Sequence, residues 1–332
     1  MKNRILLISA VIVAIGVLAF LLGRTPSDDL SGKIIIAEGS QPIAAPIYVA
    51  YAKGYFKEEG LNVELLSFPT GKLCLDALIG GKADFATAAE TPIMHATFAK
   101  QPVKIVATIH RAEENTFCVA RKSKGINAPN DLKGKTIAIP IGTNAEYGFY
   151  AFLNSQGIKA NEVKLLNLSP PEMIGPFSKG NVDAVVGWQP HIGRCEASAG
   201  KDTVVFSFKN VYQETYNLVT NNLLAEEKQE ITVKVLKALD KAIQFMQADS
   251  SESIRIVATR LGMDTAELTK LWPIYHFGLD LKPKLVETME KEGQWAIEQG
   301  QHNSKDKPDN MSTYLAPSAL DKAIRKDSVH VK

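Results

Sequence analysis

Short polar or glycine-containing segments follow the predicted strands of this 332-residue chain. Several of them end in residues that commonly begin helices, such as Thr70, Thr91 and Thr143. The first backbone amides of a helix have no acceptor inside the helix, so they favour an anion, by about 0.3–1 kcal/mol for each helix end. Ligands of open parallel sheets lie beyond the carboxyl ends of the strands. The segments concerned are residues 38–43, 69–72, 89–92, 141–144, 169–171 and 188–190.

The candidate ligand-binding residues lie in these segments, except for Glu214, which precedes a later strand. They are Ser40, Gln41, Thr70, Gly71, Glu90, Thr91, Thr143, Asn144, Trp188 and Glu214. Trp188 is suited to wall an apolar part of a ligand. Glu90, Glu146 and Glu214 are suited to neutralise an ammonium group, while His110 and Arg111 offer a further anion contact. A simpler interpretation stays open, in which the small polar residues cap helices, the acids are solvated and Trp188 belongs to a core.

The elements that must position these residues occur twice. Gly81 and Asp84 recur as Gly180 and Asp183, 99 residues later, and Gly60 corresponds to Gly157. The first copy predicts strands at 33–37 and 62–68, helices near 44–53 and 72–79, a short strand after Asp84 and a helix from Pro92. The second predicts strands at 135–140 and 162–168, helices at 145–155 and 172–178, a short strand after Asp183 and a helix after Pro190. This alternation predicts an α/β fold with parallel sheets covered by helices, in two lobes that face each other across a cleft.

Other strands are predicted outside the copies, at residues 104–111, 116–121 and 216–220. We expect the last two to connect the lobes, which makes the first lobe discontinuous. The expected limits are residues 33–115 with 217–325 for lobe 1, and 116–216 for lobe 2. The helical C-terminal part, 223–300, should pack on lobe 1, because Leu236, Leu239, Ile243 and Met246 recur at helical spacing.

The N-terminal 24 residues are typical of a membrane-targeting signal. Lys2 and Arg4 precede an uncharged run at residues 5–23, intermediate between a signal-peptide core and a membrane span. We favour an uncleaved signal anchor over a cleaved peptide, with residues 25–32 as a linker, and a buried core helix as the remaining alternative. Either kind of signal predicts a protein on the periplasmic or outer face of the cytoplasmic membrane, anchored or secreted.

Composition excludes several function classes. Without the first 24 residues the chain has 35 basic and 36 acidic residues, which argues against a nucleic-acid partner. Cys74, Cys118 and Cys195 are far apart and show no metal-ligand spacing, so we predict no metal and no cofactor. Catalytic motifs such as a P-loop or G-x-S-x-G are absent, and we predict that the protein is not an enzyme.

Four segments together resemble a known family: AYAKGYFKEEGLNVEL, GGKADFATAAETP, DLKGKTIAIPIGTNAEY and KGNVDAVVGWQP. They are similar to the nitrate/sulfonate/taurine-type substrate-binding proteins of ABC transporters, a superfamily that includes binders of thiamine-pyrimidine precursors. The resemblance implies two Rossmann-like lobes joined by two crossover strands, the type II periplasmic binding protein fold. It also implies that the chain acts as a monomer, binds a small organic or anionic solute and delivers it to an ABC permease and its ATPase.

By the same resemblance, the family's binding positions correspond to Ser40 and Gln41, Thr70 and Gly71, Thr91, Thr143 and Asn144, Trp188 and, more weakly, Glu214. Glu146 departs from the residues often found in sulfonate and taurine binders. One alternative is a membrane-tethered ligand sensor with the same fold. Another is an enzyme similar to thiamine-pyrimidine synthases, although their CCCFC motif is absent from this sequence.

Overall fold

The computed structural model describes residues 32–324. The predicted signal segment, residues 1–24, lies outside this range, as does the predicted linker except for its last residue. Among the helices of residues 32–324, none is both long enough and apolar enough to cross a membrane.

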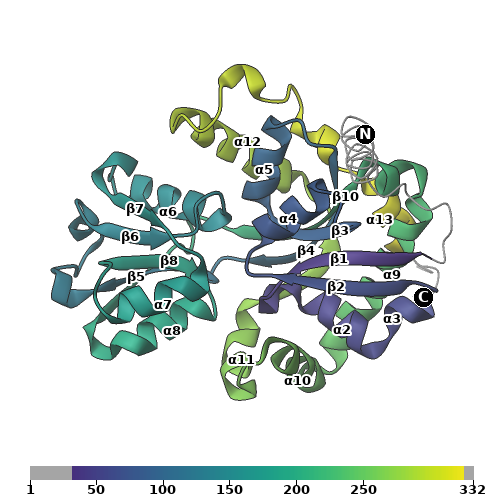
Figure 1. Cartoon of the computed structure of the whole chain (residues 1–332), viewed down its shortest axis with the longest axis horizontal. Coiled ribbons are helices and arrows are strands. Elements are labelled where there is room, and N and C mark those ends of the chain that lie inside the picture. The colour runs from purple at the N-terminus through teal and green to yellow at the C-terminus, as the bar shows by residue number, and fades with distance from the viewer. Residues whose placement is uncertain (1–31, 325–332) are drawn as a thin grey trace, which may run out of the picture.

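Two sheets organise the described chain, and each forms the centre of one lobe (Figure 1). The first sheet has the order β11-β4-β10-β3-β1-β2, with strands β1 (Lys33–Gly39), β2 (Asn62–Phe68), β3 (Phe85–Ala89), β4 (Val103–Ala112), β10 (Glu214–Asn221) and β11 (His276–Asp280). The second has the order β7-β6-β8-β5-β9, with β5 (Thr116–Arg121), β6 (Thr136–Ile139), β7 (Lys164–Asn167), β8 (Ala184–Trp188) and β9 (Thr203–Ser207). The predicted α/β class with two lobes is confirmed.

The sequence repeat has a structural cause in both lobes. In lobe 1 the Asp84 carboxylate accepts a hydrogen bond from the Ile35 amide at 2.7 Å, and in lobe 2 Asp183 accepts one from the Thr136 amide at 2.8 Å. Each aspartate thus ties the start of the third strand of its unit to the first strand, with which that strand pairs in parallel. Gly81 and Gly180 end the preceding turns at φ of +69° and +71°, a conformation that glycine adopts without strain.

Helices cover both faces of each sheet (Figure 1). Those of the first repeat are α2 (Ala45–Lys53), α3 (Tyr55–Glu58), α4 (Gly71–Ile79) and α5 (Glu90–Phe98), and those of the second are α6 (Asn144–Ser155), α7 (Pro170–Ser178) and α8 (His191–Ala199). The predicted start of α5 at Pro92 was wrong by two residues. Its N-cap is Ala89, which provides no capping side chain, so Glu90 and Thr91 lie in the first turn of the helix instead of a loop.

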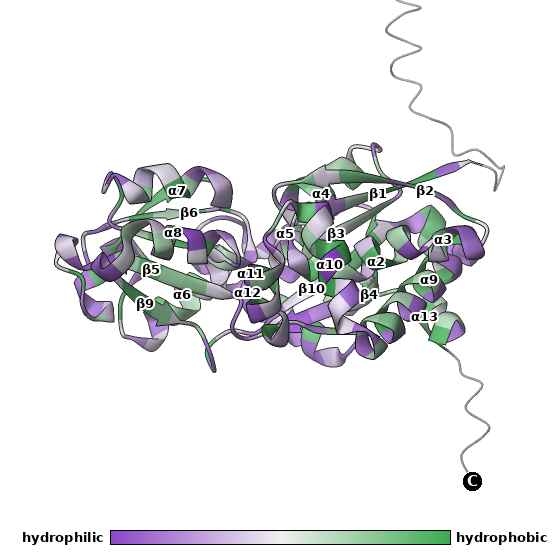
Figure 2. Ribbon diagram, turned by 90° about the horizontal axis from the view of Figure 1, so that it is seen from below, coloured by the Kyte–Doolittle hydropathy of each residue, from purple (hydrophilic) through white to green (hydrophobic). Residues whose placement is uncertain are grey.

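The C-terminal helices pack on lobe 1, as the spacing of their apolar residues predicted. They are α9 (Gln229–Ala248), α10 (Ser250–Leu261), α11 (Thr265–Leu271), α12 (Pro283–Glu298) and α13 (Pro317–Ile324). The four residues that carried the prediction are all buried, and three of them, Leu236, Leu239 and Met246, belong to the core that contains α2. Figure 2 shows the result, with apolar strands inside and hydrophilic helix faces outside.

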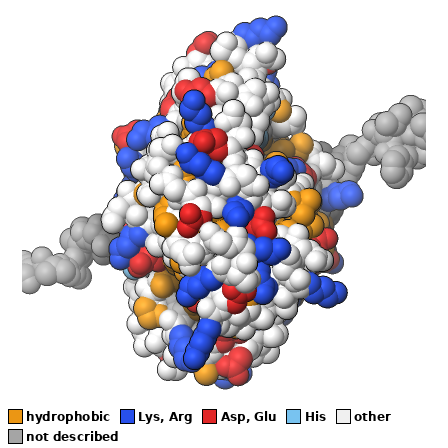
Figure 3. Space-filling model, turned by 90° about the vertical axis from the view of Figure 1, so that its left-hand side faces the viewer, with side chains coloured by type: hydrophobic (Ala, Val, Ile, Leu, Met, Phe, Trp, Pro, Cys, Tyr) orange, Lys and Arg blue, Asp and Glu red, His pale blue; other side chains and the backbone are white. Residues whose placement is uncertain are grey.

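The chain passes between the lobes twice. Residues 113–115 connect β4 to β5, and residues 208–213 connect β9 back to β10. We propose that lobe 1 comprises residues 33–115 with 217–325, and lobe 2 residues 116–216. The limit at 216 falls inside β10, whose partners β3 and β4 belong to the first sheet. On the outer end of lobe 2, basic and acidic side chains are interspersed (Figure 3), in agreement with the balanced charge of the sequence.

Candidate ligand-binding cleft

The two lobes meet around a cavity of about 10 Å³. This is close to the smallest volume that holds one water molecule. Strand ends and helix starts from both lobes line it: Gln41, Ile43, Gly71, Lys72, Ala89, Pro92, Thr143, Asn144, Trp188, Glu214, Thr215 and Tyr216. The structure therefore shows the lobes closed on each other, with side chains in contact across the cleft.

Lobe 1 supplies the start of α4. Thr70 precedes this helix, and its Oγ1 accepts a hydrogen bond from the Leu73 amide at 3.3 Å. Gly71 lies against β3, where a Cβ atom would be 3.0 Å from Ala88 Cα and 3.1 Å from Tyr216 Cε2. The absence of a side chain at position 71 lets the helix start approach β3 and Tyr216 that closely.

Lobe 2 supplies the start of α6, which begins at Asn144. The preceding loop is held by two contacts: Thr143 Oγ1 donates to the Pro140 carbonyl, and the Glu146 carboxylate accepts from the Gly142 amide, both at 2.7 Å. The other Glu146 oxygen accepts from Gln301 Nε2 at 3.0 Å, which links α6 to the C-terminal part of lobe 1. Burial raises the pKa of Glu146.

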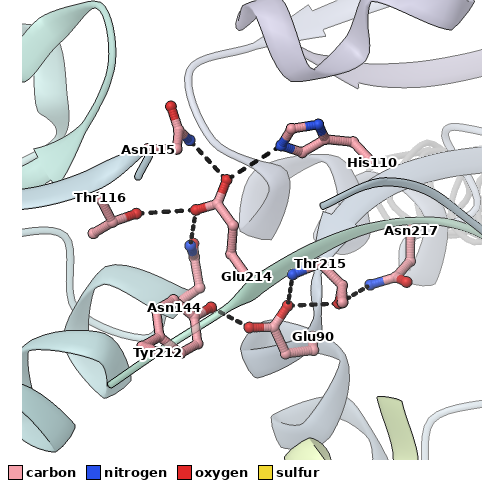
Figure 4. Close-up of polar contacts among 9 residues, drawn as sticks. All are labelled: Glu90, His110, Asn115, Thr116, Asn144, Tyr212, Glu214, Thr215 and Asn217. Atoms are coloured by element: carbon pink, nitrogen blue, oxygen red, sulfur yellow. Dashed lines mark hydrogen bonds and ion pairs between the residues drawn. The ribbon is translucent and has the colours of Figure 1, made fainter. Parts of the chain in front are cut away.

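Glu214, the first residue of β10, lies at the hinge between donors from both lobes (Figure 4). Its carboxylate accepts hydrogen bonds from Asn115 Nδ2 at 2.7 Å, Thr116 Oγ1 at 2.9 Å and Asn144 Nδ2 at 3.0 Å. His110 Nε2 is 3.6 Å away, and burial lowers the pKa of this histidine. The side chain of Glu214 is thus surrounded by neutral donors.

A second buried carboxyl group, Glu90, does not line the cavity but contacts Thr215, which does, and so lies behind the cavity wall. Figure 4 shows its contacts. It accepts hydrogen bonds from the Tyr212 hydroxyl and from the Thr215 amide and hydroxyl, the last two at 2.8 and 2.7 Å. Burial raises its pKa to about 7. Glu292 of α12 accepts from Thr91 Oγ1 at 2.7 Å, and its pKa is also raised, first by burial and then by the charge of Glu90.

One donor in the cavity lining has no partner. Trp188 ends β8, its side chain is 3% exposed, and its Nε1 makes no hydrogen bond within the described part of the chain. A buried N–H group without an acceptor costs about 1–3 kcal/mol. An acceptor atom of a bound molecule would remove this cost.

The structure brings together part of the candidate set from the sequence. The residues that line the cavity are Gln41, Gly71, Thr143, Asn144, Trp188 and Glu214. Ser40 is exposed, and its amide donates to the Phe68 carbonyl at 2.8 Å. Thr70 caps α4. Glu90 and Thr91 lie behind the cavity wall, where they make the contacts described above. Of the two further anion contacts considered, His110 lies beside Glu214, and Arg111 forms an ion pair with Asp280 of β11.

Sequence analysis did not select the other six residues of the lining, which include Lys72 and Tyr216. Lys72 follows Gly71 at the start of α4, so its place in the predicted helix could have identified it as a lining residue. Its Nζ lies 2.8 Å from Asp76 one turn later. Tyr216 had no such signal, because its position depends on the pairing of β10 with β3, across about 130 residues of sequence.

Comparisons with known proteins agree with the resemblance drawn from the motifs. A family model described as NMT1/THI5 like matches residues 41–253. The taurine-binding periplasmic protein of Escherichia coli (strain K12) is 30% identical over 157 residues, which cover 47% of this chain and 48% of that protein. A putative aliphatic sulfonates-binding protein of Bacillus subtilis (strain 168) is 26% identical over 220 residues, 65% of this chain and 66% of that protein. The chain thus spans about half to two thirds of these relatives.

Solved structures share the fold at lower identity. The alkanesulfonate-binding protein SsuA from Xanthomonas axonopodis pv. citri, bound to MOPS, has a TM-score of 0.75 at 17% identity and covers 87% of this chain and 99% of its own. The periplasmic nitrate-binding protein NrtA from Synechocystis PCC 6803 has a TM-score of 0.67 at 14% identity, covering 90% and 89%. The expected type II periplasmic binding fold is confirmed.

Proposed function

Because the chain belongs to the NMT1/THI5-like family, we propose that it is the solute-binding component of an ABC importer. It captures a small organic or anionic solute between its lobes and delivers it to the permease. The relatives named above are binding proteins for taurine and aliphatic sulfonates, and the structural neighbours bind an alkanesulfonate or nitrate. None of these names denotes an enzyme, which favours solute binding over the synthase-like alternative.

The observation that carries the proposal is the interlobe cavity with its free donor. Two helix starts, α4 from one lobe and α6 from the other, meet there with Trp188 Nε1, which has no acceptor among residues 32–324. A solute that binds both lobes shifts the population toward the closed form. The permease then distinguishes the closed form from the open one.

The remaining parts of the proposal concern location and partners. The taurine-binding relative is named periplasmic, which supports an extracytoplasmic location for this chain. We propose that residues 1–24 attach it to the membrane or direct its export, that its partners are an ABC permease and its ATPase, and that it acts as a monomer without a nucleic-acid partner.

A binding experiment tests the function. Calorimetry of the purified protein with taurine, ethanesulfonate and nitrate should give one-to-one binding for at least one solute, with compaction on binding in small-angle scattering. Trp188→Phe keeps an aromatic ring but removes the free N–H group, so affinity should fall roughly twofold to tenfold. Trp272→Phe, outside the cavity lining, is the control and should bind like the wild type. Failure of every solute to bind would refute the proposed function for this group of compounds.

A further inference from the structure

Glu214 is a buried carboxylate in a ligand cavity without a cationic partner of its own. The residue is 3% exposed, and within residues 32–324 it forms no ion pair with a lysine or arginine. Its hydrogen-bond donors are the amides of Asn115 and Asn144 and the hydroxyl of Thr116, all neutral. A buried charge compensated only by dipoles is less stable than one that also has a counter-charge.

The cation nearest to this cavity does not fill that role. Lys72 lines the cavity, but its Nζ is 2.8 Å from the Asp76 carboxylate, so its charge is already compensated. His110 is 3.6 Å from Glu214, and burial lowers its pKa, which favours the neutral ring. Glu214 therefore leaves a net negative charge at this wall of the cleft.

The buried groups behind the wall supply no positive charge to Glu214. Thr215 lines the cavity, and its amide and hydroxyl both donate to Glu90. Glu292 lies next to Glu90, and one of its buried oxygens has no hydrogen-bond partner in the described chain. Burial raises the pKa of Glu90. In residues 32–324, the groups next to this part of the wall are thus carboxyl groups, and neither Glu90 nor Glu292 has an ion pair with a lysine or arginine.

Building on the proposed function, we infer that the solute carries a cationic nitrogen, such as an ammonium group, and that Glu214 is the residue that selects it. The nitrogen approaches Glu214 from the cavity, on the side where Asn144 Nδ2 now donates at 3.0 Å. The rest of the solute is an acceptor-bearing group that reaches Trp188 Nε1 and the starts of α4 and α6. This describes a small amino acid or aminosulfonate. A simple anion such as nitrate would leave Glu214 uncompensated and add a second negative charge.

Matched pairs of probes test the inference by calorimetry: taurine against ethanesulfonate, and β-alanine against propionate. Within a pair that binds, the amine-bearing member should bind roughly tenfold to a hundredfold more tightly, the value of a charge-assisted hydrogen bond. Glu214→Gln should weaken only the amine-bearing member and reduce the difference to within about threefold. Glu196→Gln, on the exposed face of α8, is the matched control and should preserve the wild-type ratio.

The outcomes separate this inference from the function on which it rests. Equal binding of both members of a pair by the wild type, or an unchanged ratio in Glu214→Gln, overturns the selection by Glu214 and leaves solute binding intact. Absence of binding by all four probes counts against the proposed function and against the inference together. The wild-type comparison needs no variant, so it decides the matter even if Glu214→Gln does not fold.

Discussion

At the scale of single residues, the carboxyl pair Glu90 and Glu292 has a consequence for stability. The unfolded chain ionises Glu90 near its ordinary pKa of 4.5, whereas the folded protein retains the proton up to about pH 7. Between these values the folded state binds more protons than the unfolded state, so the free energy of unfolding falls as the pH rises. The loss is about 3 kcal/mol at most, and above pH 7 this contribution no longer changes.

Glu292 contributes a loss of the same sign, because burial and the charge of Glu90 raise its pKa, and we predict that Glu292→Gln removes this loss. The glutamine oxygen can still accept from Thr91, and its amide can donate toward Glu90 from the position of the oxygen that now has no partner. Urea unfolding should show the variant about 1–3 kcal/mol more stable than the wild type at pH 8, with no advantage at pH 4.5. Histidines with lowered pKa, such as His95 and His191, change stability in the opposite direction, but they cancel in the difference between the two proteins.

The control for Glu292→Gln is Glu287→Gln, which changes an exposed residue of the same helix, α12. Its stability should follow the wild-type curve at every pH. A constant difference between Glu292→Gln and the wild type across pH 4.5–8 would contradict the assignment, because it would mean that the pKa of Glu292 is not raised by folding.

At the scale of elements, α4 and α7 occupy equivalent places in the two repeats but differ in what a glycine does there. A Cβ atom at Gly71 would be 3.0 Å from Ala88 Cα, whereas one at Gly175 of α7 would have no atom within 4 Å. We predict that Gly71→Ala destabilises the protein by about 1–3 kcal/mol and weakens solute binding, because α4 must move away from β3. Gly175→Ala should instead stabilise it by ~0.5–1 kcal/mol. Thermal unfolding and calorimetry of both variants check the contrast, and equal effects would contradict it.

Much of the element order could be predicted from the sequence, because the signals are local. The turn glycines and Asp84 with Asp183 sit at the same point of each unit, and hydrogen bonds within the unit explain their recurrence. The start of α5 was predicted incorrectly, since Pro92 is a strong local signal and Ala89 provides none. Local patterns also located the strand ends and helix starts that line the cavity.

The partners of the acidic residues could not be predicted in this way. Glu90 is bound by Tyr212 and Thr215, more than 120 residues later, and Thr91 contacts Glu292 across 201 residues. No periodicity or spacing indicates contacts of this kind, because they depend on how the connections between lobes bring β10 and α12 to α5. The sequence therefore showed that these residues were polar and near the cleft, but not that they form a second layer behind it.

At the scale of the whole molecule, contacts across the cleft hold the described chain closed. Trp295 of α12 packs against Tyr147 and Tyr150 of α6, with ring centroids 5.4 and 5.7 Å apart. On another side of the cleft, Arg194 of α8 lies 3.5 Å from Glu267 of α11. This exposed ion pair contributes little. The buried bond from Asn144 to Glu214, at 3.0 Å, is the polar contact most directly tied to the cavity.

We predict that Asn144→Ala opens the solute-free protein. The variant loses a hydrogen bond to a buried carboxylate, worth about 1.5–3 kcal/mol, so the ratio of open to closed molecules should rise roughly tenfold to a hundredfold. Small-angle scattering should show a larger radius of gyration for Asn144→Ala than for the wild type. The control, Asn154→Ala, changes an exposed residue of the same helix and should have the wild-type radius of gyration. If the solute brings a cation to Glu214, saturating solute should restore the compact form of Asn144→Ala, because the ligand then replaces the missing donor. A variant that stays as compact as the wild type without solute would mean that the aromatic contacts of α12 with α6 hold the lobes together unaided.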